Sequence, residues 1–549
     1  MNWILGFILI LIAVCIIDIQ LKKRNKAKTR KKLIENWGKA KQEKYFNFTL
    51  IDQFFRNHKS SAKVYQTITD QTWQDLDLND IFKFLDRTTS KIGQQFLYFK
   101  LRTISDISEL NRFKNLTETF NSNPVLRIKT QLELSRLSTD KAYYLEEIFR
   151  SEDMEKSNKI WLFRMLSLTA VTSIILSFFN PTWFLLLIPI FFINLIFHYK
   201  NKSSVQYYLN GVAQLAASYK VATSLSASKE IKSYYKDLDF LKNMKSILSK
   251  IRFIEWEKKL DNEYTLLFWF VSEFIKITFN IEPILFYNFQ NTLDDKKENI
   301  KSLFLFLGEI DAAISCASLQ ADEIKTCKPK FINKKEVFSK EIYHPLIENC
   351  VSNSLCLEDR SLLLTGSNMS GKTTFIRTFS INAILAETLN ICFAEKFEIP
   401  FFKIYSSIRI SDDLVNKTSY YLEEVVRIRE LIEASKKEEA CLFILDELFK
   451  GTNTVERISA GRSVLSYLNK KNHIVMVSTH DLELTDLLKE RNFALYHFTE
   501  SIEENELIFD HKIKQGKPNT GNAIKILKMY DYPAEIIEDA RDVKNYEFN

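Results

Sequence analysis

The sequence predicts an α-helical N-terminal and middle region with transmembrane helices, followed by a domain of the α/β class. Two apolar runs, Trp3–Ile19 and Trp161–Phe197, are long enough to cross a membrane. Between residues 33 and 330, glycine and proline are rare and Leu, Ile and Phe recur at helical spacing. From residue 361 onward, short apolar strand patterns alternate with helical patterns, which is typical of a parallel sheet covered by helices.

Composition limits the classes of function. The chain has 549 residues and is 46% hydrophobic, which excludes a mainly disordered protein. Its formal charge is +7, but eight basic residues lie between Lys22 and Lys32, so the rest is nearly neutral. Overall charge therefore does not indicate nucleic-acid binding, and a DNA-binding patch would have to be local. The seven cysteines are scattered and form no CxxC pair, which favours unpaired thiols in a reducing compartment and no zinc site.

The first apolar run predicts a transmembrane anchor over residues 1–20. A cleaved signal peptide is the alternative, but no charged segment precedes the run and no small-residue cleavage site follows it. Residues 21–32 form a basic juxtamembrane segment, which the positive-inside preference places in the cytoplasm beside anionic headgroups.

The second apolar run predicts a transmembrane helical hairpin over residues 161–198. Asn180-Pro181 interrupts it midway and favours a tight turn, and lysines flank both open ends. A buried hairpin in a soluble protein is the alternative. Three spans then place the chain in the inner (cytoplasmic) membrane as a multi-pass protein, with the C-terminal domain in the cytoplasm.

The remaining middle region, residues 33–160 and 199–330, is expected to be helical. The segment DLNDIFKFLDRTTSKIGQQFLYFKL, which starts at Asp77, has an amphipathic pattern that breaks at Thr88–Thr89 and resumes near Gly93.

A phosphate-binding loop is predicted after the strand Ser361–Thr365, because GSNMSGKTT follows it and an apolar-periodic helix continues to Ile384. Glycines at both ends let successive N–H groups and the helix N-terminus surround phosphate oxygens. Lys372 would reach the β- and γ-phosphates, and Thr373 would hold Mg²⁺. The predicted nucleotide-binding residues of the loop are Gly366, Ser367, Asn368, Met369, Ser370, Gly371, Lys372, Thr373 and Thr374.

Two further strands are expected to end beside this loop. Cys441–Asp446 reads as a buried parallel strand next to the strand of the loop, and its end would place Asp446 on the metal and Glu447 on the attacking water. Alone, these acids could equally begin a solvated helix. Ile474–Ser478 is followed by His480, which could hydrogen-bond the γ-phosphate; an isolated histidine would more often be structural.

These motifs carry a resemblance. TGSNMSGKTTFIRT, LDELFKGTNT, STHDLELT and the tail from His511 are similar, in order and spacing, to the ATPase domain of the MutS family over residues 341–541. LDRTTSKIGQQFL resembles the start of that family's helical lever domain. The resemblance implies a P-loop NTPase domain of the ABC/MutS type over residues 331–549, preceded by a MutS-core-like helical part over 33–160 and a lever-like part over 199–330.

The resemblance also implies site residues and partners. ATP and Mg²⁺ would be the cofactors, with Thr373 and Asp446 on the metal, Glu447 and His480 catalytic, and His511 stacked on the base, although an exposed loop position is the alternative for His511. The family's other adenine-side aromatic falls near Cys350, so that stacking partner is expected to be lost. DDLVNKTSYYLEEV resembles a loop that crosses a dimer interface, where Thr418 or Ser419 would supply a hydroxyl to the partner's ATP in a homodimer.

The chain is expected to be a membrane-anchored variant that lacks the mismatch-recognition domain, because residues 1–76 hold only the anchor, the basic segment and a short helical part. It is also expected to lack an appended nuclease domain. Its expected function is ATP binding and hydrolysis, with family-implied binding of mismatched or branched DNA in DNA repair. The alternatives are an ATP-driven or transport-coupled membrane machine that does not bind DNA, and a scaffold with slow turnover. The absence of an LSGGQ sequence speaks against a transporter.

Overall fold

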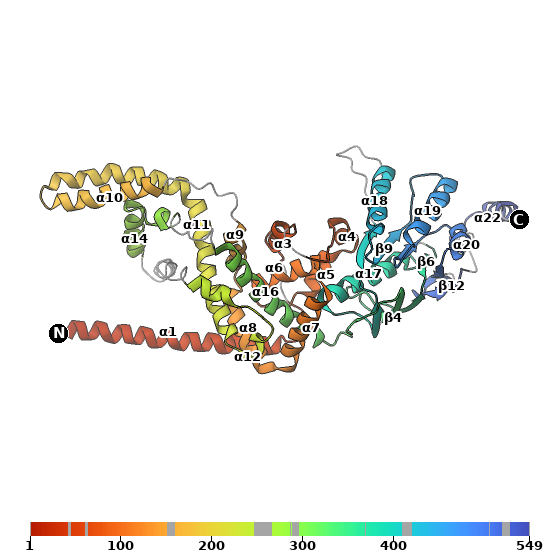
Figure 1. Ribbon diagram of the computed structural model, residues 1–549, viewed down its shortest axis with the longest axis horizontal. Helices are drawn as coiled ribbons and strands as arrows, with labels where there is room; N and C mark the ends of the chain where they lie inside the picture. The colour runs from red at the N-terminus through yellow and green to blue at the C-terminus, as the bar shows by residue number, and fades with distance from the viewer. Residues whose placement is uncertain are drawn as a thin grey trace. The chain divides into compact units, whose positions relative to one another are not determined.

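The computed structural model describes residues 2–41, 45–60, 64–150, 160–245, 266–285, 287, 296–367, 369–408, 420–503, 506–518 and 527–547. The chain forms two compact units (Figure 1). The helical unit contains Met1–Ala62, Asp86–Phe99 and Arg112–Asp322, and the α/β unit contains Lys63–Leu85, Lys100–Asn111 and Glu323–Asn549. The α/β unit thus includes two short segments that the sequence assigns to the helical middle.

The N-terminal and middle region is mostly helical, which confirms that prediction. Its α-helices are α1 (Asn2–Glu35), α2 (Phe48–Ile51), α3 (Gln53–His58), α4 (Asp70–Asp75), α5 (Leu78–Leu85), α6 (Lys91–Arg102), α7 (Ile107–Ser122), α8 (Pro124–Leu134), α9 (Leu145–Arg150), α10 (Ile160–Ser177), α11 (Leu187–Ser226), α12 (Lys229–Lys232), α14 (Leu266–Thr278) and α16 (Lys297–Gln320). Short 3₁₀ turns, η1 (Ser135–Leu137), η2 (Asp140–Tyr144) and η3 (Pro181–Leu186), connect some of them.

The predicted helix break at Thr88–Thr89 is confirmed, since α5 ends at Leu85 and α6 begins at Lys91. The buried carboxylate of Asp311, on α16, accepts hydrogen bonds from the backbone N–H groups of Thr89 (2.9 Å) and Ser90 (2.6 Å). These N–H groups precede α6 and have no partner within it, so Asp311 caps the helix from a distant part of the chain.

α10, η3 and α11 form a helical hairpin (Figure 1) where the sequence predicts one. Pro181 occupies the first position of η3, and the side chain of Asn180 accepts a hydrogen bond from the Thr182 N–H (3.1 Å), so both residues close the turn as expected. Among the described residues, three helical stretches have the length and apolar composition of a membrane span: Ile160–Ser177, Pro181–Lys200 and Lys297–Gln320. Crossing of a membrane stays a prediction.

α1 is one continuous helix from Asn2 to Glu35, so the predicted anchor and the basic segment share a helix. The basic side chains are largely exposed. The side chains of residues 1–15 and 18, which make up most of the predicted anchor, lie outside the described ones.

The α/β unit is built on a six-stranded sheet in the order β14-β11-β6-β10-β9-β8. β6 (Ser361–Thr365), β8 (Lys403–Ser407), β9 (Cys441–Asp446), β10 (Ile474–Ser478) and β11 (Phe493–His497) are mutually parallel, and β14 (Lys514–Gln515) is antiparallel to β11. The expectation that β9 lies directly beside β6 is wrong, because β10 pairs with both and separates them.

Smaller sheets complete this unit. β3 (Lys330–Phe331), β7 (Lys396–Ile399), β4 (Glu336–Ile342) and β5 (Asn353–Glu358) form a four-stranded sheet in that order, and β12 (Glu500–Glu503) pairs with β13 (Glu506–Phe509). β1 (Gln66–Thr67) and β2 (Thr103–Ile104) form a ribbon. The Gln66 amide exchanges two hydrogen bonds with the backbone of Ile404 on β8 (2.7 and 2.8 Å), which joins this early segment to the unit.

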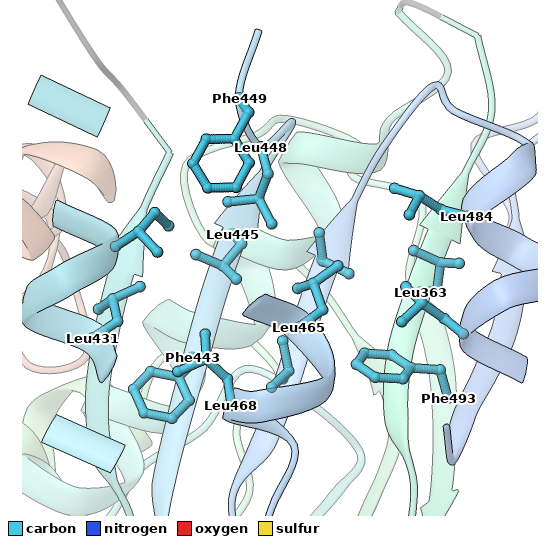
Figure 2. Packing of buried hydrophobic residues seen from close by; sticks show 14 of the residues in the cluster. Leu363, Leu431, Phe443, Leu445, Leu448, Phe449, Leu465, Leu468, Leu484 and Phe493 are labelled. Carbon is cyan, nitrogen blue, oxygen red and sulfur yellow. The ribbon is translucent and has the colours of Figure 1, made fainter. Parts of the chain in front are cut away.

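Helices cover both faces of the six-stranded sheet. α18 (Tyr420–Ser435), α19 (Thr454–Leu468) and α20 (Glu483–Lys489) pack on one face against Leu363, Phe443 and Phe493, as Figure 2 shows. α17 (Lys372–Leu389) contacts β9 and β10, and the alternation of side chains along a strand assigns it to the opposite face. The last helix is α22 (Ala534–Glu547). The carboxyl ends of β6, β9 and β10 therefore meet at one edge of the sheet.

Candidate active site

The loop 366–371 joins the end of β6 to the start of α17, and two glycines make its path possible. Gly366 has φ +144°, and a Cβ there would lie 2.8 Å from the carbonyl oxygen of Phe498. Gly371, at φ +113°, is the N-cap of α17. Both backbone conformations are costly for other residues, so glycine is required at each end of the turn. The first N–H groups of α17 are left without helical partners and face the loop.

Lys372 lies on the first turn of α17 and folds back over the loop. Its Nζ donates hydrogen bonds to the carbonyl oxygens of Gly366 (2.7 Å) and Ser367 (2.9 Å). Burial of the side chain lowers the pKa of Lys372, while the nearby carboxylates of Glu447 and Asp446 oppose that shift. The ammonium group is thus held in the loop by main-chain acceptors and two acidic neighbours.

Thr373 and Asp446 meet at the carboxyl edge of the sheet. The Thr373 hydroxyl donates to Oδ2 of Asp446 (2.8 Å), and the Ser478 hydroxyl, at the end of β10, donates to Oδ1. Asp446 is therefore held from both sides, and a small cluster of hydroxyl and carboxylate oxygens forms next to the loop. Among the described residues, no group of three or more His, Cys, Asp or Glu side chains is arranged to hold a metal.

Glu447 lies between two cationic or polar partners. Its Oε1 is 3.0 Å from Nε2 of His480, and its Oε2 is 2.6 Å from Nζ of Lys450. The hydrogen bond from His480, followed by that from Lys450, lowers the pKa of Glu447 to about 2 against the opposing effect of burial. The carboxylate is ionised at neutral pH and accepts only, so the His480 Nε2 must carry the proton. Nε2 of His480 also lies 3.2 Å from Nζ of Lys372. Both nitrogen atoms are then donors in this contact.

A pocket of about 450 Å³ opens beside the loop. Its lining includes Ser367, Met369, Gly371, Lys372, Thr373, Thr374 and Glu447, the more apolar residues Ile342, Tyr343, Ile347, Val351, Phe375 and Phe498, and the polar residues Glu348, Asn349 and Asn353. A lining that combines a helix N-terminus with apolar side chains suits a ligand with phosphate groups and an aromatic ring.

His511 lines the pocket and is exposed. Its Nδ1 lies 3.0 Å from the carbonyl oxygen of Ser370, and its ring stacks on Phe509 at a centroid distance of 5.9 Å. Asn353 fixes this segment, because its side-chain amide donates to the His511 carbonyl oxygen (3.0 Å) and accepts from the Ile513 N–H (2.8 Å). The imidazole is thus positioned beside the loop although it lies on a connecting segment.

The predicted site residues fall into three groups. The loop residues that line the pocket lie together with Glu447 and His511. Asp446 and His480 join them through Thr373 and Glu447. Asn368, Thr418 and Ser419 lie outside the described residues. Cys350 lines the pocket, and its Sγ accepts from the His344 N–H (3.4 Å), so this position offers a thiol in place of an aromatic ring.

Four contacts in this region were not foreseen. They involve Ser478 on Asp446, Lys450 on Glu447, Phe498 in the pocket wall, and Glu500, whose Oε2 accepts from the Ser367 hydroxyl (2.6 Å). Ser478 could have been found, since it ends a strand that was already expected at this edge. Phe498 and Glu500 could not, because they follow β11, whose place beside β6 is set by tertiary packing.

Comparison with known proteins identifies the domain. Residues 362–546 match the family model of MutS domain V. Over these residues the chain is similar to MutS-family proteins. The DNA mismatch repair protein MutS of Listeria welshimeri is 30% identical over 271 residues, 47% of this chain and 31% of the relative. The MutS protein of Geobacillus sp. is 28% identical over 279 residues, which are 48% of this chain and 32% of the relative. The MutS protein of Pseudothermotoga lettingae is 31% identical over 261 residues, which are 46% of this chain and 32% of the relative. The chain thus spans about a third of the length of these MutS relatives.

Proposed function

We propose that this chain is a MutS-family, Mg²⁺-dependent ATPase with a P-loop site at residues 366–374, anchored in a membrane. The observation that carries the proposal is the hydrogen bond between Thr373 and Asp446, next to a loop that encloses Lys372. A hydroxyl from the first turn of α17 and a carboxylate from the end of β9 meet beside the pocket of about 450 Å³.

The residues present fit ATP and Mg²⁺. Oxygen ligands suit Mg²⁺, which takes few protein ligands and keeps several waters and phosphate oxygens, so the Thr373 hydroxyl and the Asp446 carboxylate are sufficient. They would hold the ion on the β- and γ-phosphate side of the nucleotide. When bound, Mg²⁺ supplies charge neutralisation at the phosphate oxygens. The adenine would lie against the apolar lining residues, with His511 at its edge.

Residues of the chain itself would bind the phosphates and orient the attacking water. The N–H groups at the start of α17 donate to phosphate oxygens, and Lys372 exchanges its carbonyl partners for them. Glu447, ionised and held by His480, accepts a hydrogen bond from the attacking water and orients it. Lys450 already uses one lone pair of Oε2 of Glu447, so the water would donate to a remaining lone pair or displace this ammonium group. His480 would donate its Nε2–H toward the γ-phosphate only by giving up or sharing its hydrogen bond to Glu447.

Dimerisation through this domain is part of the proposal and is supported by the family alone. The sequence similarity to MutS suggests a homodimer in which Thr418 or Ser419 reaches the partner's nucleotide.

Location in the inner membrane, with the α/β unit in the cytoplasm, is supported by the hairpin of α10 and α11. Only 17% and 11% of the two candidate stretches are buried, against 89% for α16, so the hairpin presents an apolar surface that protein does not cover. The test is extraction of cell membranes with alkaline carbonate. The full chain should remain in the pellet, and release into the supernatant would contradict membrane insertion.

The central experiment measures ATP hydrolysis by the detergent-solubilised chain with and without Mg²⁺. Lys372→Ala should abolish nucleotide binding. Lys436→Ala is the matched control, since Lys436 directly follows α18 and forms an exposed ion pair with Glu433 (2.6 Å). Hydrolysis that persists in Lys372→Ala, or is independent of Mg²⁺, would refute the proposed site.

A second function, binding of mismatched or branched DNA, is proposed on the similarity to DNA mismatch repair proteins MutS. Binding of duplex, mismatched and branched DNA should be measured over a salt series, with and without ATP. Salt-sensitive binding that ATP modulates would support a DNA-handling role. ATP turnover without DNA binding at moderate salt would refute it and favour an ATP-driven or transport-coupled membrane machine.

A further inference from the structure

Two cysteines of the α/β unit face each other across an antiparallel bridge. Cys327 precedes β3, and Cys392 follows the end of α17. The N–H of Cys327 donates to the carbonyl oxygen of Cys392 (2.8 Å), and the N–H of Cys392 donates to that of Cys327 (2.9 Å). Residues that exchange both hydrogen bonds have Cα atoms about 5.5 Å apart and side chains on the same face. The Cα separation lies within the range of about 4.4–6.8 Å that disulfides span, and the Cβ atoms, about 4.5–5.5 Å apart in opposed residues, would have to approach to about 3.5–4.5 Å.

The two side chains lie on the same face of the bridge and differ in their surroundings. The neighbouring Cys392 thiol lowers the pKa of Cys327, while burial raises the pKa of Cys392 well above its usual value. Cys392 is fully buried, with its Sγ 3.7 Å from the carbonyl oxygen of Asn382, whereas Cys327 is only partly buried. A more acidic, accessible thiol beside a buried one is the arrangement in which the first is oxidised and the second resolves it.

We propose that Cys327 and Cys392 are an oxidisable dithiol, a modification site whose co-substrate is a hydroperoxide. The Cys327 thiolate attacks the terminal peroxide oxygen, the O–O bond breaks, and the alcohol or water leaves, so that a sulfenic acid forms on Cys327. The Cys392 sulfur then attacks the Cys327 sulfur, loses its proton, and displaces water. One peroxide is reduced by two electrons, and two thiols become one disulfide.

The disulfide would join the segment before β3 to the segment that follows α17. The closed loop would contain β3, β4, β5, β6, the loop 366–371 and all of α17, so the bond would restrain the phosphate-binding loop but not Asp446, Glu447 or His480, which follow later in the chain. The six cysteines with described side chains are free thiols. The sequence analysis expects unpaired thiols, and the proposal adds that two of them are placed to pair on oxidation. It does not depend on ATP hydrolysis.

The test treats the full detergent-solubilised chain with an equimolar amount of hydrogen peroxide, then alkylates it under denaturing conditions and maps the peptides by mass spectrometry. We expect a peptide pair joined through Cys327 and Cys392, with loss of two alkylatable thiols that dithiothreitol restores. Cys327 should be lost at least about tenfold faster than the exposed Cys356 on β5, which has a raised pKa.

Two variants complete the experiment. In Cys392→Ser, Cys327 should stop at the sulfenic acid, which dimedone traps, whereas Cys356→Ser should give the same linked peptide as the unsubstituted chain. If Cys392→Ser does not fold, the linked peptide in the unsubstituted chain decides. The proposal is overturned if Cys392 remains alkylatable while Cys327 proceeds to sulfinic acid, if Cys327 pairs with another cysteine, or if it reacts no faster than Cys356.

Discussion

Replacement of Glu447 by glutamine separates a catalytic role of this residue from a structural one. The amide keeps the size of the side chain and an oxygen that can still accept from Nε2 of His480 (3.0 Å), but it removes the negative charge that pairs with Lys450 at 2.6 Å. Both partners are partly exposed, with 48% and 36% of their side chains accessible, so the lost contacts should change the free energy of unfolding by less than about 1 kcal/mol. Loss of the water-orienting carboxylate should lower kcat by about 100-fold or more, equivalent to about 2.7 kcal/mol in the barrier.

The assay is single-turnover hydrolysis of bound ATP, together with thermal unfolding of each variant. Glu433→Gln is the matched control, because Glu433 also pairs with a lysine three residues later at 2.6 Å but lies outside the pocket. We expect Glu447→Gln to bind ATP and hold it, and Glu433→Gln to turn over normally. A kcat within threefold of the unsubstituted chain, in a folded Glu447→Gln that binds ATP, would refute the assignment of Glu447 to the attacking water; the threefold limit is roughly 0.6 kcal/mol.

Four further outcomes are expected. Ser478→Ala removes one of two hydrogen bonds on Asp446 and should weaken Mg²⁺ binding by about tenfold, measured by Mg²⁺ titration of nucleotide binding. Gly308→Ala places a Cβ 2.4 Å from the Cβ of Phe96 and should destabilise the helical unit by about 1–3 kcal/mol in urea unfolding. Gly461→Ala on α19 is the control, because the nearest atom to its Cβ is 3.9 Å away, and it should leave stability unchanged or raise it. Phe443→Ala should cost about 3–5 kcal/mol, because the ring is fully buried in the cluster of Figure 2. Glu447 has a folded pKa of about 2, below its ordinary 4.5, so its contribution to stability, which the exposure of its partners keeps below about 1 kcal/mol, is present above 4.5 and lost as the pH falls toward 2; the difference in unfolding free energy between the unsubstituted chain and Glu447→Gln should shrink below about pH 4.

The parts of the site that the sequence predicts are those carried by short-range chemistry. Gly366 and Gly371 require positive φ, and Lys372 follows directly on the helix N-terminus, so the loop can be placed from its own residues. Asp446 is predicted because it ends an apolar strand, and parallel strands meet at one edge.

The parts that the sequence does not predict depend on packing between distant segments. β10 separates β9 from β6, and nothing within any of the three strands encodes that order. Gln66 joins the α/β unit through Ile404, 338 residues later, by an amide that pairs with main-chain groups and leaves no pattern in the sequence. Lys450 is the intermediate case, because its spacing from Glu447 permits a pair but does not require one.

Hydropathy alone cannot distinguish a lipid-facing helix from a core helix, and α16 demonstrates the difference. α16 and the two arms of the hairpin all have the length and composition of a membrane span. On α16, however, 89% of the apolar stretch is buried, Gly308 admits Phe96 against the helix, and the Asp311 carboxylate caps α6. A carboxylate with specific partners on another helix is expensive in lipid and ordinary in a protein core. The hairpin has the opposite character, since Phe178 and Phe179 at its turn are each 85% exposed. Burial thus explains the hydropathy of α16 without a membrane, whereas the hairpin has an exposed apolar surface that a bilayer would account for.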